Sequence, residues 1–165
     1  MTGPIINLEN LDFKKHGDQK HFQAERAKIT DSIGGGKLGC SVYKVPPGKK
    51  AWPYHSHHAN EELYLILEGA GIYRYGNEEY QIRAGDIMVA PPGGTDQAHQ
   101  ILNNSEANLR YIAVSTMESP DIMEYPDSEK FGVFAGAAPG GDASSRTFSH
   151  FGRTEDAVGY WEDES

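Results

Sequence analysis

The stretch that decides the fold lies in the first half of the chain, where residues 48–69 read GKKAWPYHSHHANEELYLILEG. On a β-strand, residues i and i+2 point to the same face, so His55 and His57 can aim two imidazoles at one point. Glu62 begins an apolar run, residues 63–67, that reads as a buried strand, and it can add a carboxylate oxygen. Imidazole suits Zn, Cu, Fe and Ni, and a carboxylate also suits Mn. The pattern predicts a divalent-metal site, although an isolated H-x-H also fits two surface histidines.

A fourth candidate ligand, His99, starts another expected strand beyond the Gly/Pro loop at residues 91–94. Both histidine groups flank sharp turns, which is where the mouths of barrels form. By strand parity Tyr64 and Ile66 share the face of Glu62, so both are expected to line a cavity beside the metal. Tyr64 is then either a proton donor or a buried core aromatic.

Short apolar runs separated by Gly and Pro turns surround these residues. We expect strands at 41–45, 63–67, 71–75, 79–83, 87–90, 99–102 and 109–115, and one more edge strand at 146–151. This spacing is typical of a sandwich or barrel, and no helical pattern interrupts it, which disfavours a parallel βαβ sheet. Residues 24–28 form either a helical turn or a segment that wraps around the barrel. We expect residues 136–141 to be an exposed loop.

The length and composition fit one globular domain. The chain has 165 residues, 38% of them hydrophobic and 24% charged, and we see neither an internal repeat nor a linker between two cores. We therefore predict a single domain over residues 1–165. Its core barrel spans about 38–116, with an N-terminal arm at 1–37 and a C-terminal extension at 117–165.

The net charge of −9 disfavours nucleic acid and anionic membranes as partners, because both would be repelled. No run reaches the roughly 18 apolar residues of a membrane helix, and residues 1–20 lack the apolar core of a signal peptide. The expected location is therefore the cytoplasm. Cys40 is the one cysteine, so it forms no intramolecular disulfide, and its apolar context predicts a small core residue rather than a nucleophile. Residues 34–39 match G-x-G-x-x-G, but a strand follows instead of a helix, which indicates a turn.

The histidine stretch resembles the first motif of the cupin superfamily. That motif runs G, five or six residues, H-x-H, three or four residues, E, six residues, G. The chain has Gly48, six residues, His55-Ser56-His57, four residues, Glu62, six residues and Gly69. The spacing to Gly69 favours Glu62 over its neighbour Glu61 as the ligand.

The second cupin motif runs G, five residues, P-x-G, two residues, H, three residues, N. The chain has Gly85, five residues, Pro91-Pro92-Gly93, five residues, His99, three residues and Asn103. The loop before His99 is thus three residues longer than the pattern, and strict spacing would put Asp96 at the histidine position. The preserved H-x-x-x-N register favours His99.

The resemblance implies an all-β fold, a double-stranded β-helix or jelly-roll barrel with irregular N- and C-terminal extensions. It implies that His55, His57, Glu62 and His99 hold one divalent transition metal (Zn, Mn, Fe or Ni), and that the protein is a homodimer. The stretches 119–122, 124–128 and 160–162 also resemble a cupin subgroup whose members are described as uncharacterised cupins or candidate sugar phosphate isomerases. Fold does not fix chemistry, so this description stays a hypothesis.

Three functions compete. The first is a metalloenzyme of isomerase or dioxygenase type that acts on a small oxygen-rich metabolite, with metal identity as the discriminator. The second is a non-catalytic module that binds a small molecule. A seed-storage-like structural role ranks last, because those duplicated proteins usually lose the histidines. Of the remaining histidines, His58 points off the ligand face, toward solvent, and no partners are identifiable for His16, His21 and His150.

Overall fold

The computed structural model describes residues 3–164. The strands are β1 (Lys14–His16), β2 (Ala24–Lys28), β3 (Leu38–Val45), β4 (Ser56–His57), β5 (Glu62–Glu68), β6 (Ala70–Tyr75), β7 (Glu78–Arg83), β8 (Ile87–Ala90), β9 (His99–Leu102), β10 (Leu109–Thr116), β11 (Asp121–Tyr125), β12 (Lys130–Ala135) and β13 (Phe148–Arg153). Helical structure in this range is limited to α1 (Thr30–Ile33) and short 3-10 turns at Leu8–Asn10, Thr95–Gln97, Pro126–Ser128, Ala143–Ser145 and Thr154–Asp156. No helix among residues 3–164 is long and apolar enough to cross a membrane.

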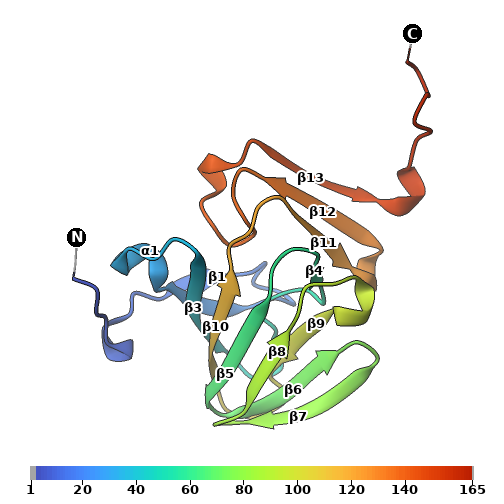
Figure 1. The fold of residues 1–165 in the computed structure, drawn as a ribbon. Helices are drawn as coiled ribbons and strands as arrows, with labels where there is room; N and C mark the ends of the chain where they lie inside the picture. Colours follow the sequence, from blue (N-terminus) through green and yellow to red (C-terminus); the bar gives the residue numbers. More distant parts are fainter. Residues whose placement is uncertain (1–2, 165) are drawn as a thin grey trace.

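Antiparallel pairing joins the strands into three sheets. The first has the order β1-β2-β3-β10-β5-β8, the second β7-β6-β9 and the third β13-β12-β11-β4. The strands of the first two sheets make the barrel, and β11 to β13 lie over one end of it (Figure 1). The chain is therefore an all-β jelly-roll barrel, which confirms the predicted fold class.

The barrel core is made by alternate residues of strands from the first two sheets. Its most deeply buried side chains include Val45 and Leu109, both fully buried, and Ile66. Tyr43 on β3 stacks on Tyr111 on β10 with ring centroids 5.1 Å apart. Gly69 of the first motif has a positive φ of 84°, and a Cβ there would lie 2.5 Å from the backbone oxygen of Asn108. The motif glycine is thus required by backbone contact as well as by conformation.

The seven expected barrel strands are all present as β3 and β5 to β10, with ends that differ from the predicted ones by at most three residues. The edge strand expected at 146–151 is β13, shifted toward the C-terminus. The alternative of a helical turn at residues 24–28 is wrong, because this segment is β2 and pairs with both β1 and β3. At residues 34–39, Gly34 caps α1 with a φ of 87° and β3 begins at Leu38, so the interpretation as a turn is confirmed.

The C-terminal extension is more regular than the sequence indicates. Strands β11 to β13 form a sheet with β4, and Met123, Tyr125 and Phe134 make a second small core within it. The expectation of an exposed loop at residues 136–141 is wrong, because most of its residues are half-buried and Ala138 is buried. This loop packs against the barrel end instead of extending into solvent, and it helps to enclose the cavity described below.

Candidate metal centre

Four side chains meet at the end of the barrel under the C-terminal sheet. His57 is on β4, Glu62 opens β5 and His99 opens β9. His55 is held against His99 by two backbone hydrogen bonds of 2.8 and 3.2 Å, which bring the two motifs together. The structure thus gathers the four residues that the motifs single out.

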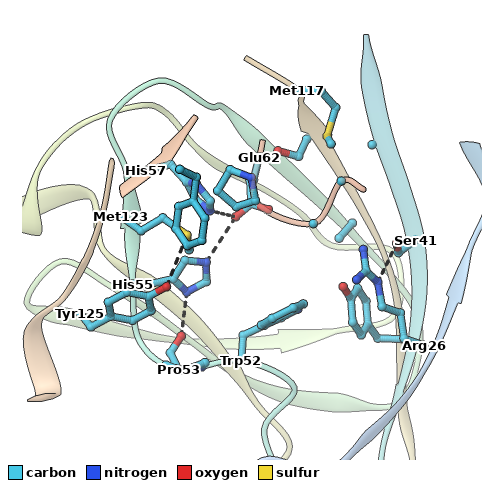
Figure 2. Close-up of a pocket in the computed structure, with 18 of the residues that line it drawn as sticks. Arg26, Ser41, Trp52, Pro53, His55, His57, Glu62, Met117, Met123 and Tyr125 are labelled. Atoms are coloured by element: carbon cyan, nitrogen blue, oxygen red, sulfur yellow. Dashed lines mark hydrogen bonds and ion pairs between the residues drawn. The ribbon is translucent and has the colours of Figure 1, made fainter. Parts of the chain in front are cut away.

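Their nitrogen atoms converge on one carboxylate oxygen. The Oε2 atom of Glu62 lies 2.8 Å from Nε2 of His99, 3.5 Å from Nε2 of His57 and 3.8 Å from Nε2 of His55. Ligand atoms of His55, Glu62 and His99 all lie within 4.8 Å of one another, and His57 joins this group through its contact with Glu62. Figure 2 shows His55, His57 and Glu62 facing one another at one side of the cavity.

The far nitrogen of each imidazole has a fixed partner. Nδ1 of His55 lies 2.7 Å from the carbonyl oxygen of Pro53, and Nδ1 of His99 lies 3.1 Å from that of Gln97. A carbonyl oxygen only accepts, so both Nδ1 atoms carry the proton and donate it. In a neutral imidazole Nε2 is then the lone-pair nitrogen, and it points into the site. Such outer contacts orient metal-binding histidines.

His57 has a charged partner, Asp121 on β11. Nδ1 of His57 donates to Oδ2 of Asp121 at 2.7 Å, and Asp121 also accepts from Nδ2 of Asn60 (2.8 Å) and from the backbone N–H of Ala59 (2.9 Å). Burial works against the charged form of Asp121, but the His57 hydrogen bond and charge, with the Asn60 and Ala59 hydrogen bonds, outweigh it and hold its pKa below the usual value. Asp121 therefore stays a carboxylate and fixes the orientation of His57.

The electrostatics of the four donors suit a cation. Burial, together with the neighbouring His99 and His57, lowers the pKa of His55 to about 3, so its imidazole is neutral. Burial alone would raise the pKa of Glu62, but the His99 hydrogen bond and the three imidazoles hold it well below its usual range. The three Nε2 atoms then face a buried carboxylate. Their approach is attractive only if a proton or a metal ion lies between them, so the residues fit a divalent metal.

Tyr64 is the nearest hydroxyl. It is buried, it lines the cavity as expected, and its Oη donates to Oε2 of Glu62 at 2.7 Å. Burial and the Glu62 charge raise the pKa of Tyr64 well above its ordinary value, so the phenol keeps its proton. Ile66 was expected to line the same cavity, but it lies in the barrel core. It is two residues further along β5 than Tyr64 and so lies deeper in the barrel.

The alternatives that the sequence left open lie away from this cluster. Asp96 is exposed and accepts from the Gln97 side chain, and Glu61 is exposed where the chain enters β5. His58 faces solvent and pairs with Glu124 at 2.6 Å. Asn103 is fully buried and donates to the carbonyl oxygens of Val45 and Ala107, which explains the fixed spacing from His99 to Asn103.

Beside the donors lies a cavity of about 510 Å³, a volume suited to a small molecule. Its walls come from β2, β3 and β5 of the barrel, from β11 to β13 and from the loop at 136–141. The apolar part of the lining includes Trp52, Met117, Met123, Tyr125 and Phe134. Two contacts of this site were not predicted from the sequence. Asp121 belongs to no spacing pattern, and His16, for which no partner was identifiable, packs on Trp52 with ring centroids 4.1 Å apart.

The sequence of this chain is similar to a described protein family and to two curated proteins. A family model described as Cupin domain matches residues 41–115. The chain is 33% identical over 84 residues to an uncharacterized protein of Methanocaldococcus jannaschii, covering 48% of this chain and 64% of that one. It is 32% identical over 71 residues to an oxalate-binding protein of Thermotoga maritima, covering 43% of this chain and 55% of that one. The chain thus spans less than two thirds of the length of both relatives.

Solved structures show which fold the whole chain shares. A candidate sugar phosphate isomerase of Acidithiobacillus ferrooxidans is 21% identical, with a TM-score of 0.76 and coverage of 93% of this chain and 94% of that one. A sugar phosphate isomerase of Silicibacter pomeroyi is 20% identical, with a TM-score of 0.75 and coverage of 93% and 95%. A predicted oxalate decarboxylase of Thermotoga maritima covers only 68% of this chain, at a TM-score of 0.58 and 22% identity. At these identities the likeness establishes fold alone, and in the first two it extends beyond the barrel.

Proposed function

We propose that residues 41–115, which match the family model described as Cupin domain, form a domain of that kind, which holds one divalent transition metal and acts on a small oxygen-rich metabolite. The ligands in this proposal are His55, His57, Glu62 and His99. The observation that carries it is the convergence of three Nε2 atoms on the Glu62 carboxylate, at 2.8 to 3.8 Å, beside a cavity of small-molecule size.

A metal held there would polarise an oxygen atom of the metabolite as a Lewis acid. Other residues of the protein orient the proposed metal ligands and line the cavity. Pro53, Gln97 and Asp121 keep the three imidazoles turned toward the site. Tyr64 donates a hydrogen bond to Oε2 of Glu62 and so orients the carboxylate. Tyr125 stacks on His55 with ring centroids 6.2 Å apart, and the apolar walls, which include Met123, would shield a bound ligand from water.

The first candidate activity is of isomerase or dioxygenase type. To test it, metal-free protein is reconstituted separately with Fe(II), Mn(II), Ni(II) and Zn(II). Each form is assayed for oxygen uptake and, with a panel of aldose and ketose phosphates in D₂O, for deuterium incorporation detected by NMR. We expect one metal to give turnover that Glu62→Gln abolishes and Glu61→Gln retains. Absence of turnover with every metal and every substrate class would exclude this activity for the compounds tested.

The second candidate is a non-catalytic module that binds the same kind of molecule, and one observation favours it. Among the described residues, Glu62 is the only carboxylate that lines the cavity, and it is already engaged by His99 and Tyr64. The phenols that remain hold their protons, and burial raises the pKa of Tyr125 to about 12. A cavity without a free general base binds more readily than it transfers protons. Metal-dependent ligand binding without turnover would support this second function.

A further inference from the structure

The cavity is lined by positively charged side chains that are not part of the proposed metal site. Its lining includes Glu62 as the one carboxylate and four cationic side chains, Arg26, Lys28, Lys130 and Arg146. The chain as a whole has a net charge of −9, so this enrichment runs against its composition. Lys28 has a partner, Asp31, at 3.1 Å. The two arginines have no ion pair with any carboxylate among residues 3–164.

Arg26 is held rigidly at the wall opposite the donors. It lies on β2 directly across from Tyr43 on β3, and its Nε donates to Oγ of Ser41 at 3.0 Å. Its guanidinium carbon is 5.7 Å from the ring centroid of Tyr43 and 5.8 Å from that of Trp52, within the range of cation–π attraction. Figure 2 shows Arg26 on one side of the cavity and His55 and Glu62 on the other. Within residues 3–164, the terminal nitrogens of Arg26 have no hydrogen-bond acceptor.

Arg146 reaches the same cavity from the C-terminal segment. Its guanidinium lies over the ring of Phe134, with the carbon 4.8 Å from the centroid, and its Nε is buried with no hydrogen-bond partner in the part of the chain that the structure describes. Cations that leave bulk water are normally paired, because an unpaired charge loses hydration without compensation. Two half-buried guanidinium groups without anionic partners therefore indicate that the partner is a ligand.

We propose that Arg26, assisted by Arg146, forms an anion subsite that binds a carboxylate or phosphoryl group of the cavity's ligand. The planar fork of a guanidinium pairs with two oxygens of such a group, and Ser41 and the aromatic rings already fix the orientation of Arg26. The subsite rests on the proposed function only in that the ligand's other oxygen atoms face the metal donors. The natural ligand is then an anionic small molecule whose charged end lies away from Glu62.

The test uses Trp52, which lines the cavity beside Arg26. A Trp161→Phe background removes the second tryptophan, which is 79% exposed. Inorganic phosphate and malonate are titrated as phosphoryl and carboxylate probes, with glycerol as the neutral control. We expect saturable fluorescence changes with an anion and none with glycerol. Arg26→Gln should weaken that binding roughly tenfold or more, and Arg26→Lys should weaken it less.

The matched control is Arg83→Gln, which makes the same charge change at an exposed position outside the cavity. It should leave the affinity within about twofold, because exposed charges contribute little. The anion that binds more tightly in an Arg26-dependent manner identifies the ligand's charged group. Anion binding that the Arg26→Gln/Arg146→Gln double variant retains at full strength, or no binding of either anion, overturns the subsite.

Titrations of both metal-free and metal-loaded protein separate this inference from the proposed function. If no metal binds but Arg26-dependent anion binding persists, the proposed metal function fails and the subsite stands. If metal binds and the double variant keeps both the parent metal content and the parent anion affinity, the subsite alone is wrong. Circular dichroism of each variant shows whether the fold is retained.

Discussion

Nδ1 of His57 lies 2.7 Å from Oδ2 of Asp121, and this buried contact joins the barrel motif to the C-terminal sheet. The two residues are brought together by the pairing of β4 with β11, in which Met123 stands opposite His57. Burial opposes the charged form of His57, but the Asp121 hydrogen bond and the Glu62 charge outweigh it and raise the pKa of His57. The C-terminal extension is therefore part of the proposed site as well as a cover over it.

Asp121→Asn should weaken metal binding by about 10- to 100-fold, as expected when an outer partner of a ligating histidine is lost. The amide must place an N–H against Nδ1–H of His57, Nδ2 of Asn60 or the N–H of Ala59, all of which are donors. Competition with a chromophoric chelator measures the affinity. The control is Asp127→Asn, which breaks an exposed ion pair with Arg74 and should leave the metal affinity unchanged. Equal affinity of both variants would show that Asp121 does not position His57.

Metal binding should stabilise the fold, because the donors converge only in the folded chain. At free metal a hundredfold above Kd, the free energy of unfolding should rise by about 2.7 kcal/mol, which appears as a higher melting temperature. Scanning calorimetry of metal-free and loaded protein measures the rise. Glu62→Gln should abolish it and Glu61→Gln should keep it, because Glu61 is exposed outside the site. The reverse result would mean that Glu61 is the ligand.

Asn103→Ala should lower the free energy of unfolding by about 2–3 kcal/mol without changing metal content. Asn103 is fully buried, donates to Val45 and Ala107, and accepts from the backbone and hydroxyl of Ser105, so its loss removes four hydrogen bonds, including the buried one to the carbonyl oxygen of Val45. Urea denaturation gives the value. Asn104→Ala, at the exposed neighbouring position, should change it by less than about 0.5 kcal/mol. A similar small change at Asn103 would contradict the structural role.

The barrel and its four donors were predictable because their signals are local. Short apolar runs between Gly and Pro turns define β3 and β5 to β10, and the donors follow fixed spacings along the chain. The buried face of strand β11 is difficult to predict from the sequence. Its buried residues are Asp121, Met123 and Tyr125, whereas Ile122 is 42% exposed, so a charged residue on the inner face and an apolar one on the outer face weaken its apolar periodicity. The Asp121–His57 contact spans 64 residues and depends on tertiary pairing that no spacing encodes. The homodimer and the cytoplasmic location stay predictions.

Cys40 should react slowly with thiol reagents. It is half-buried on β3, and burial raises the pKa of its thiol, so less thiolate is present at any pH below that value than in a free cysteine. With 5,5′-dithiobis(2-nitrobenzoic acid) at pH 8, the rate should be lower than for glutathione and should increase as the pH rises. A rate above that of glutathione would contradict the expectation of an inert core residue.

The most direct test of the proposed metal centre is elemental analysis of reconstituted protein with His57→Ala and His58→Ala side by side. The two variants remove adjacent imidazoles, one facing Glu62 at 3.5 Å and one facing solvent beside Glu124. The account predicts about one metal per chain in the parent and in His58→Ala, and loss of most of it in His57→Ala. A parent that binds no metal after reconstitution, or a His57→Ala variant that retains as much as His58→Ala, would contradict it.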